Sequence, residues 1–387
     1  MFPTLSHLIA YLTGVRVNLP IQTFGACMAL AFWAAYLVFR SEFKRKEALE
    51  IIHPFPQTRM IGAPASLRLL GLSGVGGFIA GAKMGTVWSH RAFYIGSLQD
   101  FLFSFRGSLA GGLLAGAITI LTVFFYRRRQ QLAIPEQVTE RLHPYQLMDR
   151  LLLYCGIFGF IGAILFAKFE NTAGISLDPL GWLFTFNGLN YYGALIFGAL
   201  AYLYITRKHG IPLAVAADIG SPGMMLAYGM GRIGCHLAGD GDWGIVNERP
   251  RPSWLSWAPE WMWKFRFPHN SVHQGVYIPG CGDHYCTELV DPVYPTSFYE
   301  AVVCLLLFAL LWILRRKISL AGLLFFIFAL LNGAERFLIE FIRVNPHYEL
   351  FGWTLTQSQI IAVLWMGVGG VGIGLCMRRL NADLLQN

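Results

Sequence analysis

Nine stretches of this chain are each apolar enough and long enough to cross a bilayer as a helix. They cover residues 23–40, 69–89, 107–126, 150–168, 190–206, 214–236, 296–314, 320–343 and 356–377. A spanning helix needs about 20 mainly apolar residues, and only helices and closed barrels satisfy their backbone polar groups inside lipid. The chain is 55% hydrophobic and 13% charged, whereas soluble domains carry about 25% charged residues. We therefore predict an all-α, polytopic membrane bundle of about nine transmembrane helices.

Basic residues gather at the ends of alternate stretches, beginning with the first. The clusters are Arg40 to Lys46, Arg127 to Arg129, Arg207 with Lys208, Arg315 to Lys317, and Arg378 with Arg379. Cytoplasmic loops of membrane proteins carry an excess of Lys and Arg, so we expect the N-terminus outside and the C-terminus inside. These flanks explain the net charge of +8, which therefore does not indicate binding to nucleic acid.

The predicted spans divide the chain into four parts. Residues 1–22 form an outer N-terminal arm, because they lack the basic start and the cleavage site of a signal peptide. Residues 23–236 hold the first six helices, and residues 237–295 form a large outer loop. Residues 296–387 hold the last three helices and an inner tail.

The outer loop contains two features with open alternatives. Cys281 and Cys286 are five residues apart, and we favour a disulfide over free thiols or half of a metal site. Trp254, Trp257 and Trp261 recur at helical spacing. They suit either the outer membrane interface or a compact core within the loop.

Three arginines lie inside or at the end of apolar stretches, where a charge costs roughly 2.5–3.5 kcal/mol at the bilayer centre. They are Arg232, Arg336 and Arg343. At about 1.5 Å per residue, Arg336 lies roughly 24 Å along its outward-running stretch. Tyr192 and Glu300 lie near the outer starts of stretches that run inward. The predicted topology therefore brings these side chains to the head-group level of the outer leaflet.

Arg336, Glu340 and Arg343 share one helix face, because they lie at i, i+4 and i+7. They form either an ion-pair network that holds the bundle or part of an anion site. In the second interpretation Arg232 and Arg336 bind a phosphate through bidentate hydrogen bonds, a geometry that Lys cannot reproduce. Glu340 then orients Arg336.

The glycine-rich turn after Arg232 carries His236, Asp240 and Asp242. These side chains are suited to orienting a nucleophile or accepting its proton. One His and two Asp in a flexible turn are a weak metal signal, and we predict no metal. His269 and His273 are further candidates in the loop. Asp218, at the inner end of its stretch, suits helix packing or capping.

Two pairs of stretches look like related hairpins. SFRGSLAGGLLAG, from Ser104, and NYYGALIFGALAY, from Asn190, occupy the same outer start of an inward-running helix. The similarity reflects either a duplication or the low complexity of Gly/Ala/Leu helices. Small residues of this kind let transmembrane helices approach closely.

Several motifs together resemble one family, the bacterial prolipoprotein diacylglyceryl transferases. They are IQTFGACMALAF, NYYGALIFG, GRIGCHLAGDGDWG, NGAERFLIEFIR, VYPTSFYE and LTQSQI, and the resemblance runs from Thr23 to Met377. It implies transfer of the diacylglyceryl group of phosphatidylglycerol to the lipobox cysteine of a prelipoprotein, releasing glycerol phosphate. It also implies an inner-membrane enzyme that needs no cofactor and acts at the periplasmic side.

By position, Arg232 matches the family's signature arginine, and Arg336 matches the essential arginine of the later helix. Glu340 and Arg343 continue that second motif. Four positions depart from the family pattern: Tyr192 stands for a histidine, Cys235 for an asparagine, Asn332 for a tyrosine, and Asp240 or Asp242 for a glutamate. The family has seven spans, so one hairpin is extra. We favour the Tyr192 helix as the family's histidine helix, with Arg106 in SFRGSL as its rival.

The resulting hypothesis is a transferase whose partners are phosphatidylglycerol, a prelipoprotein signal peptide and the bilayer. We assign catalysis to Arg232, Arg336, Tyr192 and His236, with Tyr192 and His236 near the proton acceptor. The predicted substrate-binding residues are Arg232, Arg336, Glu340, Arg343, Asp240, Asp242 and Glu300. The alternatives are a lipid or solute transporter or flippase, for which only Asp218 and Lys83 lie deeper, and a related transferase with another acceptor.

Overall fold

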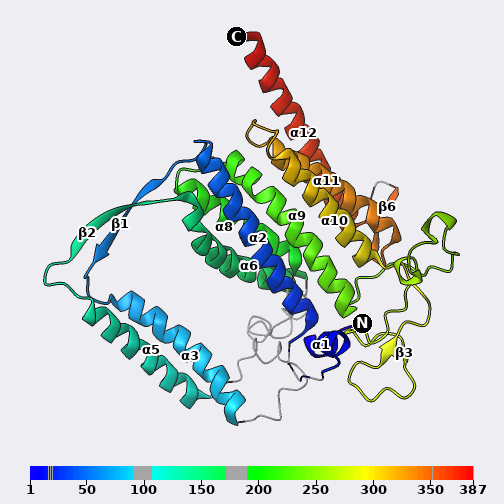
Figure 1. Cartoon of the computed structure of the whole chain (residues 1–387), viewed down its shortest axis with the longest axis horizontal. Helices are drawn as coiled ribbons and strands as arrows, with labels where there is room; N and C mark the ends of the chain where they lie inside the picture. Colours follow the sequence, from blue (N-terminus) through cyan, green and yellow to red (C-terminus); the bar gives the residue numbers. More distant parts are fainter. Residues whose placement is uncertain are drawn as a thin grey trace. The chain divides into compact units, whose positions relative to one another are not determined.

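The computed structural model describes residues 1–15, 17, 19, 21–89, 107–170, 190–350 and 352–386. These residues are mostly helical, and each of the nine predicted stretches contains one of their helices (Figure 1). Five helices of the described residues are long and apolar enough to cross a membrane: Thr23–Ala48, Leu109–Arg129, Pro144–Phe169, Thr296–Leu314 and Gln357–Ala382. The predicted all-α membrane fold is confirmed at this level.

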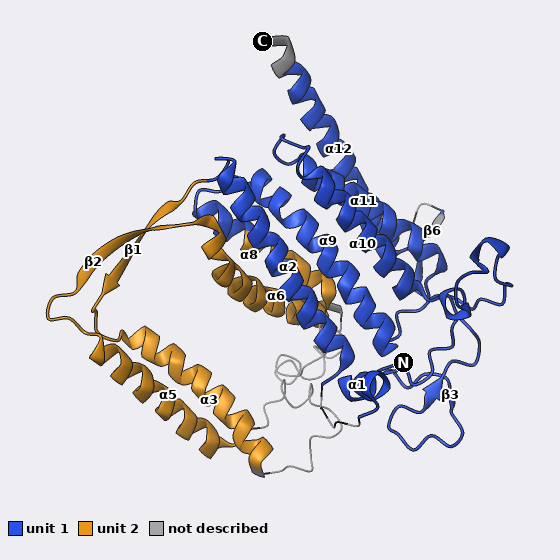
Figure 2. Cartoon of the chain, viewed as in Figure 1, with its two compact units in different colours: residues 1–52, 203–387 blue, residues 53–202 orange. Residues whose placement is uncertain are grey.

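Contacts divide the chain into two compact units, residues 1–52 with 203–387 (unit 1) and residues 53–202 (unit 2) (Figure 2). The helices of unit 1 are α1 (Leu5–Thr13), α2 (Thr23–Ala48), α9 (Leu213–Ala238), α10 (Thr296–Leu314), α11 (Leu323–Ile339) and α12 (Gln357–Gln386). Helix α9 is central, since it packs against α2, α10 and α11, and α12 packs against α11. Met225, Cys304, Leu311 and Leu324 form the apolar core between α9, α10 and α11.

At one end of this bundle a buried carboxylate caps a neighbouring helix. Asp218 is 1% exposed and accepts hydrogen bonds from the backbone amides of Gly322 at 2.7 Å and Phe325 at 2.9 Å. These amides lie at the start of α11, where backbone N–H groups have no acceptor within the helix. The capping role expected for Asp218 is confirmed.

The segment after α9 forms a small head with its own core of Trp243, Phe267, Leu289 and Val293. Its short elements are η4 (Ser253–Leu255), η5 (Glu260–Met262) and the antiparallel pair β3 (Val276–Tyr277) and β4 (Thr287–Glu288). Beyond α11, η6 (Glu340–Ile342) leads to a second antiparallel pair, β5 (His347–Leu350) and β6 (Trp353–Thr356).

The head decides the first of the two alternatives that the sequence left open and bears on the second. Cys281 and Cys286 form a disulfide, as predicted. Trp254 and Trp257 are 70% and 78% exposed, as an interfacial role requires. Trp261 instead packs its ring against Phe298 of α10, with centroids 5.0 Å apart, and so joins the loop to that helix.

Unit 2 contains the same strand–helix–helix order twice. The first copy is β1 (Phe55–Ile61), α3 (Leu67–Ser89) and α5 (Leu109–Arg129). The second is β2 (Glu136–Leu142), then η2 (Pro144–Leu147), α6 (Met148–Glu170) and α8 (Tyr191–Lys208), whose end from residue 203 belongs to unit 1. Both strands have 7 residues, and α3 and α6 each have 23. We infer an internal repeat.

Glycine contacts within the two hairpins are equivalent. A Cβ on Gly81 of α3 would clash with the carbonyl oxygen of Gly111 on α5. A Cβ on Gly162 of α6 would clash in the same way with the carbonyl oxygen of Gly193 on α8. Only glycine lets the two backbones approach this closely, as is common between transmembrane helices.

The starts of α5 and α8 are also equivalent. The Ser108 amide donates to Ala82 O at 2.9 Å, and the Asn190 amide donates to Ala163 O at 3.0 Å. Each of these two side chains also accepts a hydrogen bond from the backbone amide three residues later. The structure therefore pairs Asn190 with Ser108, four residues beyond the Ser104 start used in the sequence comparison.

An antiparallel ladder joins the two copies of the repeat. Strands β1 and β2 pair along their full lengths, and Thr58 faces Thr139 at the centre. Each is the fourth residue of its strand, and their hydroxyl oxygens are 3.4 Å apart. Because equivalent residues of the two copies pair with each other, a local two-fold axis relates the two strands. The sequence analysis did not predict these strands.

Candidate functional site

The three predicted arginines of unit 1 meet on one carboxylate. Glu300, near the start of α10, is completely buried. Its Oε1 lies 2.7 Å from Arg336 Nη1, and its Oε2 lies 3.1 Å from Arg343 Nη1 and 3.3 Å from Arg232 Nε. The arginines come from α9, the end of α11 and the segment after η6. We call Arg232, Arg336, Arg343 and the carboxylates that pair with them the arginine cluster.

Asp242, in the turn after α9, is the second shared carboxylate. Its Oδ1 lies 2.5 Å from Arg343 Nη2, and its Oδ2 pairs with Arg232. Burial raises the pKa of Asp242, but the charges of Arg232 and Arg343 outweigh burial and lower it to about 2. The Asp242 carboxylate is therefore ionised at neutral pH and holds the two arginines together.

Asp240 lies beside this pair and has different partners. Its Oδ1 accepts a hydrogen bond from the Asp242 amide at 3.4 Å. Burial and the charge of Asp242 raise the pKa of Asp240. Of the two candidates for the family's glutamate position, Asp242 is the one that contacts the arginines.

Glu340 makes the contact expected of a residue that orients Arg336. Its Oε2 lies 3.0 Å from Arg336 Nη2 and 3.9 Å from Arg343 Nε. The carboxylate is 2% exposed. The spacing of these residues on one helix face therefore produces the ion pair that the sequence indicated.

Two polar residues of the cluster were missed by the sequence analysis. The Tyr228 hydroxyl donates to Glu300 Oε1 at 3.1 Å and accepts from Arg232 Nη2 at 3.4 Å. Ser358, at the start of α12, accepts from Arg336 Nη2 at 3.1 Å. Tyr228 lies four residues before Arg232, so helical spacing was a usable signal, whereas nothing in the sequence singles out Ser358.

Backbone hydrogen bonds hold the turn after α9 against the other elements of the cluster. The Gly244 amide donates to Tyr294 O at 2.8 Å, and the Ile245 amide donates to Ile342 O at 2.9 Å. A Cβ on Gly244 would clash with Ile342 O, so glycine is required here. These contacts join the end of α9, the start of α10 and the end of α11.

The cluster can accommodate an anion as well as hold the bundle. Three guanidinium charges face the three carboxylates of Asp242, Glu300 and Glu340. Arg232 and Arg336 each meet three polar partners, and a guanidinium has five N–H donors. Their side chains are 15% and 18% exposed, against 9% for Arg343. Both therefore retain donors for a bidentate contact with a phosphate.

One group of side chains has the donor atoms of a metal site. Cys235 Sγ and one oxygen each of Asp240 and Asp242 lie within 4.8 Å of one another. Asp242, however, already pairs with two arginines, and their positive charges repel a cation. The arrangement suits a hydrogen-bonded turn better than a metal centre.

The two predicted proton acceptors lie in different surroundings. His236 has its Nδ1 3.3 Å from Ser297 Oγ, and its ring lies among four aromatic rings: Trp261, Phe265, Phe267 and Phe298. Tyr192 lies in the first turn of α8 in unit 2, with its ring 5.9 Å from that of Tyr191. Their roles stay predictions. Arg106, the rival to Tyr192, lies outside the described residues.

The loop histidines belong to the head. A ring nitrogen of His269 lies 2.7 Å from Tyr285 O, and the His273 ring stacks on the Tyr285 ring with centroids 5.2 Å apart. Both residues have φ angles near +60°, in the left-handed region. These contacts indicate a structural role around the disulfide.

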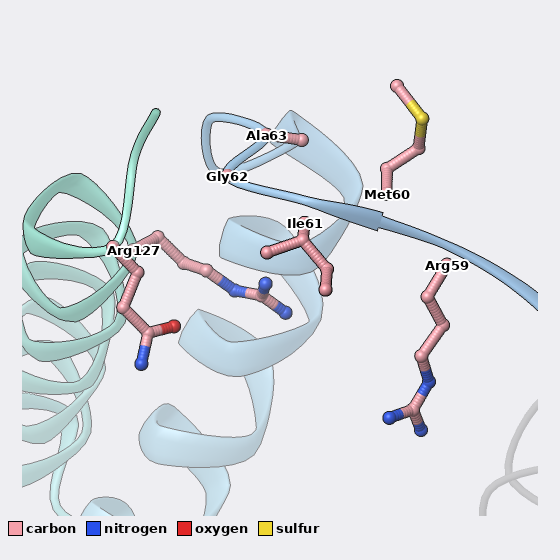
Figure 3. Close-up of a pocket in the computed structure, with 7 residues that line it drawn as sticks. Arg59, Met60, Ile61, Gly62, Ala63 and Arg127 are labelled. Carbon is pink, nitrogen blue, oxygen red and sulfur yellow. The ribbon is translucent and has the colours of Figure 1, made fainter. Parts of the chain in front are cut away.

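A cavity of about 750 Å³ lies in unit 2, beside the end of β1 and the end of α5. Arg59 and Arg127 lie on opposite sides of Ile61 in its lining (Figure 3). None of the predicted site residues lines this cavity. The arginine cluster is therefore the stronger candidate site.

Comparisons with known proteins agree with the cluster's motifs. The family model described as prolipoprotein diacylglyceryl transferase matches residues 131–375. This range includes the second hairpin of the repeat, α6 and α8, and excludes the first. The hairpin that matches the family is therefore the one that carries Tyr192.

Similar proteins include three that are named phosphatidylglycerol–prolipoprotein diacylglyceryl transferase. That of Xylella fastidiosa (strain 9a5c) is 31% identical over 228 residues, covering 54% of this chain and 70% of the relative. That of Thermus thermophilus is 32% identical, covering 56% and 78%. That of Xanthomonas campestris pv. campestris is 28% identical, covering 61% and 77%.

Proposed function

The chain belongs to the prolipoprotein diacylglyceryl transferase family, and from this premise we propose how its arginine cluster works. The enzyme transfers the diacylglyceryl group of phosphatidylglycerol to the lipobox cysteine of a prelipoprotein. Arg232 and Arg336 hold the phosphate of the lipid donor. The observation that carries this assignment is their joint contact with the buried carboxylate of Glu300, at 3.3 Å and 2.7 Å, which fixes both guanidinium groups at one point.

The charge change of the reaction explains why arginines are needed. The cysteine sulfur attacks the glyceryl carbon, the carbon–oxygen bond to phosphate breaks, and its electron pair remains on the phosphate oxygen. The phosphate gains one negative charge as glycerol phosphate leaves. Fixed donors around that oxygen stabilise the transition state more than the ground state. Glu300, Asp242 and Glu340 hold the donors in position before the substrate arrives.

Ionisation of the acceptor thiol is the other requirement. The thiolate is the nucleophile, and a free cysteine has a pKa of about 8.5, so only a few per cent is ionised at pH 7. A protein group that takes the proton raises the thiolate fraction. Tyr192 and His236 are the acceptors proposed from the sequence.

We also propose nine transmembrane helices, with the N-terminus and the arginine cluster on the periplasmic side of the bacterial inner membrane. The support is the alternation of basic clusters along the sequence and the helix found within each predicted stretch of the described residues. Phosphatidylglycerol would then enter from the outer leaflet. The prelipoprotein would present its lipobox at the same level.

The purified protein, phosphatidylglycerol labelled in the glyceryl carbons of its diacylglyceryl group and a lipobox peptide provide the direct test. We expect the label to move to the peptide in a thioether that resists hydroxylamine, with release of glycerol phosphate. Label on another acceptor would identify a related transferase. Movement of intact lipid between leaflets without chemistry would identify a flippase and refute the transferase assignment.

A further inference from the structure

One carboxylate beside the arginine cluster has no hydrogen-bond partner among the described residues. Glu335, on α11, is 7% exposed, and both of its carboxylate oxygens are buried without a partner among the described residues. A buried carboxyl group costs free energy unless it is hydrogen-bonded or paired. Asp242, Glu300 and Glu340 all avoid this cost by pairing with arginines.

The described neighbours of Glu335 donate no hydrogen bond to its carboxyl group. Its carboxyl group lies close enough to interact electrostatically with Tyr228 of α9, with Glu300 and Cys304 of α10, and with the arginines of the cluster. The Tyr228 hydroxyl donates to Glu300 instead. The Arg336 donors face Glu300, Glu340 and Ser358. Glu335 is thus a buried carboxyl group beside the cluster that receives no hydrogen bond from the described residues.

We propose that Glu335 accepts the proton of the attacking thiol, an inference that rests on the proposed transferase function. The lipobox S–H gives its proton to a Glu335 oxygen, and the resulting thiolate attacks the glyceryl carbon held beside Arg336. The carbon–sulfur bond forms as the carbon–oxygen bond to phosphate breaks. Glycerol phosphate leaves with that electron pair, and the Glu335 proton then passes to it or to water.

Geometry favours Glu335 over His236, one of the two acceptors proposed from the sequence. The Glu335 carboxyl group interacts electrostatically with Arg336 and Arg232, so it lies near the proposed phosphate-binding groups. His236 is enclosed by aromatic rings and Ser297.

The test compares Glu335→Gln with the wild type on two acceptor peptides. One carries the lipobox cysteine, and the other carries selenocysteine at the same position, whose selenol is already ionised at neutral pH. Glutamine keeps the size of the side chain but takes no proton. We expect kcat with the cysteine peptide to fall by about 10²–10⁴-fold, with little change in KM for phosphatidylglycerol. With the selenocysteine peptide, the variant should recover most of the wild-type rate.

The selenocysteine peptide also reports whether the variant is folded. Glu260→Gln serves as the matched control, because Glu260 is 67% exposed in a surface pair with Lys264, and both of its rates should equal those of the wild type. Tyr192→Phe and His236→Ala are measured in parallel.

Three results would overturn the inference. One is an unchanged rate of Glu335→Gln with the cysteine peptide. Another is an equal loss with both peptides, which would indicate a structural role. The third is a raised KM for phosphatidylglycerol at unchanged kcat, which would make Glu335 a ligand of the lipid head group. Absence of any transfer by the wild type would instead refute the proposed function on which the inference rests.

Discussion

At the scale of single residues, the sequence indicated the charged groups of the site better than their partners. Arg232, Arg336 and Glu300 were predicted to share one depth, and the structure brings both arginines onto the Glu300 carboxylate. The choice between Asp240 and Asp242 could not be made from the sequence, because it depends on how the turn after α9 folds. Glu335 was missed for a similar reason, since only packing shows that it lacks a partner.

Asp242→Asn tests the ion pairs of the turn. The folded pKa of Asp242 is about 2, below its ordinary value of 3.8. The ionised carboxylate therefore stabilises the fold above about pH 4, and this contribution is lost as the pH falls towards 2. We expect the variant to be less stable than the wild type by about 2 kcal/mol at pH 7, and the difference to shrink at pH 3.

Thermal unfolding in detergent at the two pH values measures this difference. Asp291→Asn is the control, because Asp291 is an exposed aspartate of the same loop. A gap between the variant and the wild type that is the same at pH 7 and pH 3 would contradict the role given to the Asp242 charge.

At the scale of elements, hydropathy located the helices well, but it did not predict the short strands. Each predicted span contains a helix of the described residues, because an apolar stretch of that length has few alternatives in lipid. Strands β1 and β2 have seven residues each and pair with each other. Their sequences, FPQTRMI and EQVTERL, do not alternate apolar and polar residues, so no strong pattern marks them. The hairpin similarity was visible in sequence, but its register was wrong by four residues, because glycine and leucine recur at many spacings.

The repeat predicts where an added methyl group is tolerated. In Gly162→Ala the new Cβ meets the Gly193 carbonyl, which belongs to backbone and cannot rotate away. We expect a loss of about 1–3 kcal/mol, as for overpacking of a core. A Cβ on Gly156, in the same helix, meets nothing within 4 Å, so Gly156→Ala should be neutral.

The equivalent pair in the first hairpin is Gly81→Ala against Gly76→Ala, since Gly76 also has open space. Thermal unfolding of the four variants in detergent is the measurement. Equal stability of Gly162→Ala and Gly156→Ala would show that the close helix contact does not form.

At the scale of the whole molecule, the sequence indicated a membrane transferase and the comparisons place the chain in that family. The family match begins at residue 131, so the first copy of the repeat lies outside it. We propose that this first copy is the extra hairpin expected from the span count.

Proteolysis of sealed membrane vesicles tests the proposed orientation. Trypsin should cut right-side-out vesicles in the head loop, which carries the exposed Arg266 followed by Phe267. It should reach the Arg127 to Arg129 cluster only in inverted vesicles. Cleavage at that cluster from the outside, with the head loop protected, would reverse the orientation.

The central claim is that Arg232 and Arg336 hold the donor phosphate through paired hydrogen bonds. The most direct measurement is transfer of labelled diacylglyceryl to the lipobox peptide by Arg232→Lys and Arg336→Lys. Lysine keeps the charge but loses the bidentate contact. Loss of one charged hydrogen bond, about 1.5–3 kcal/mol, predicts a fall in kcat/KM of roughly 10- to 100-fold for each variant. Wild-type transfer by both variants would contradict the claim.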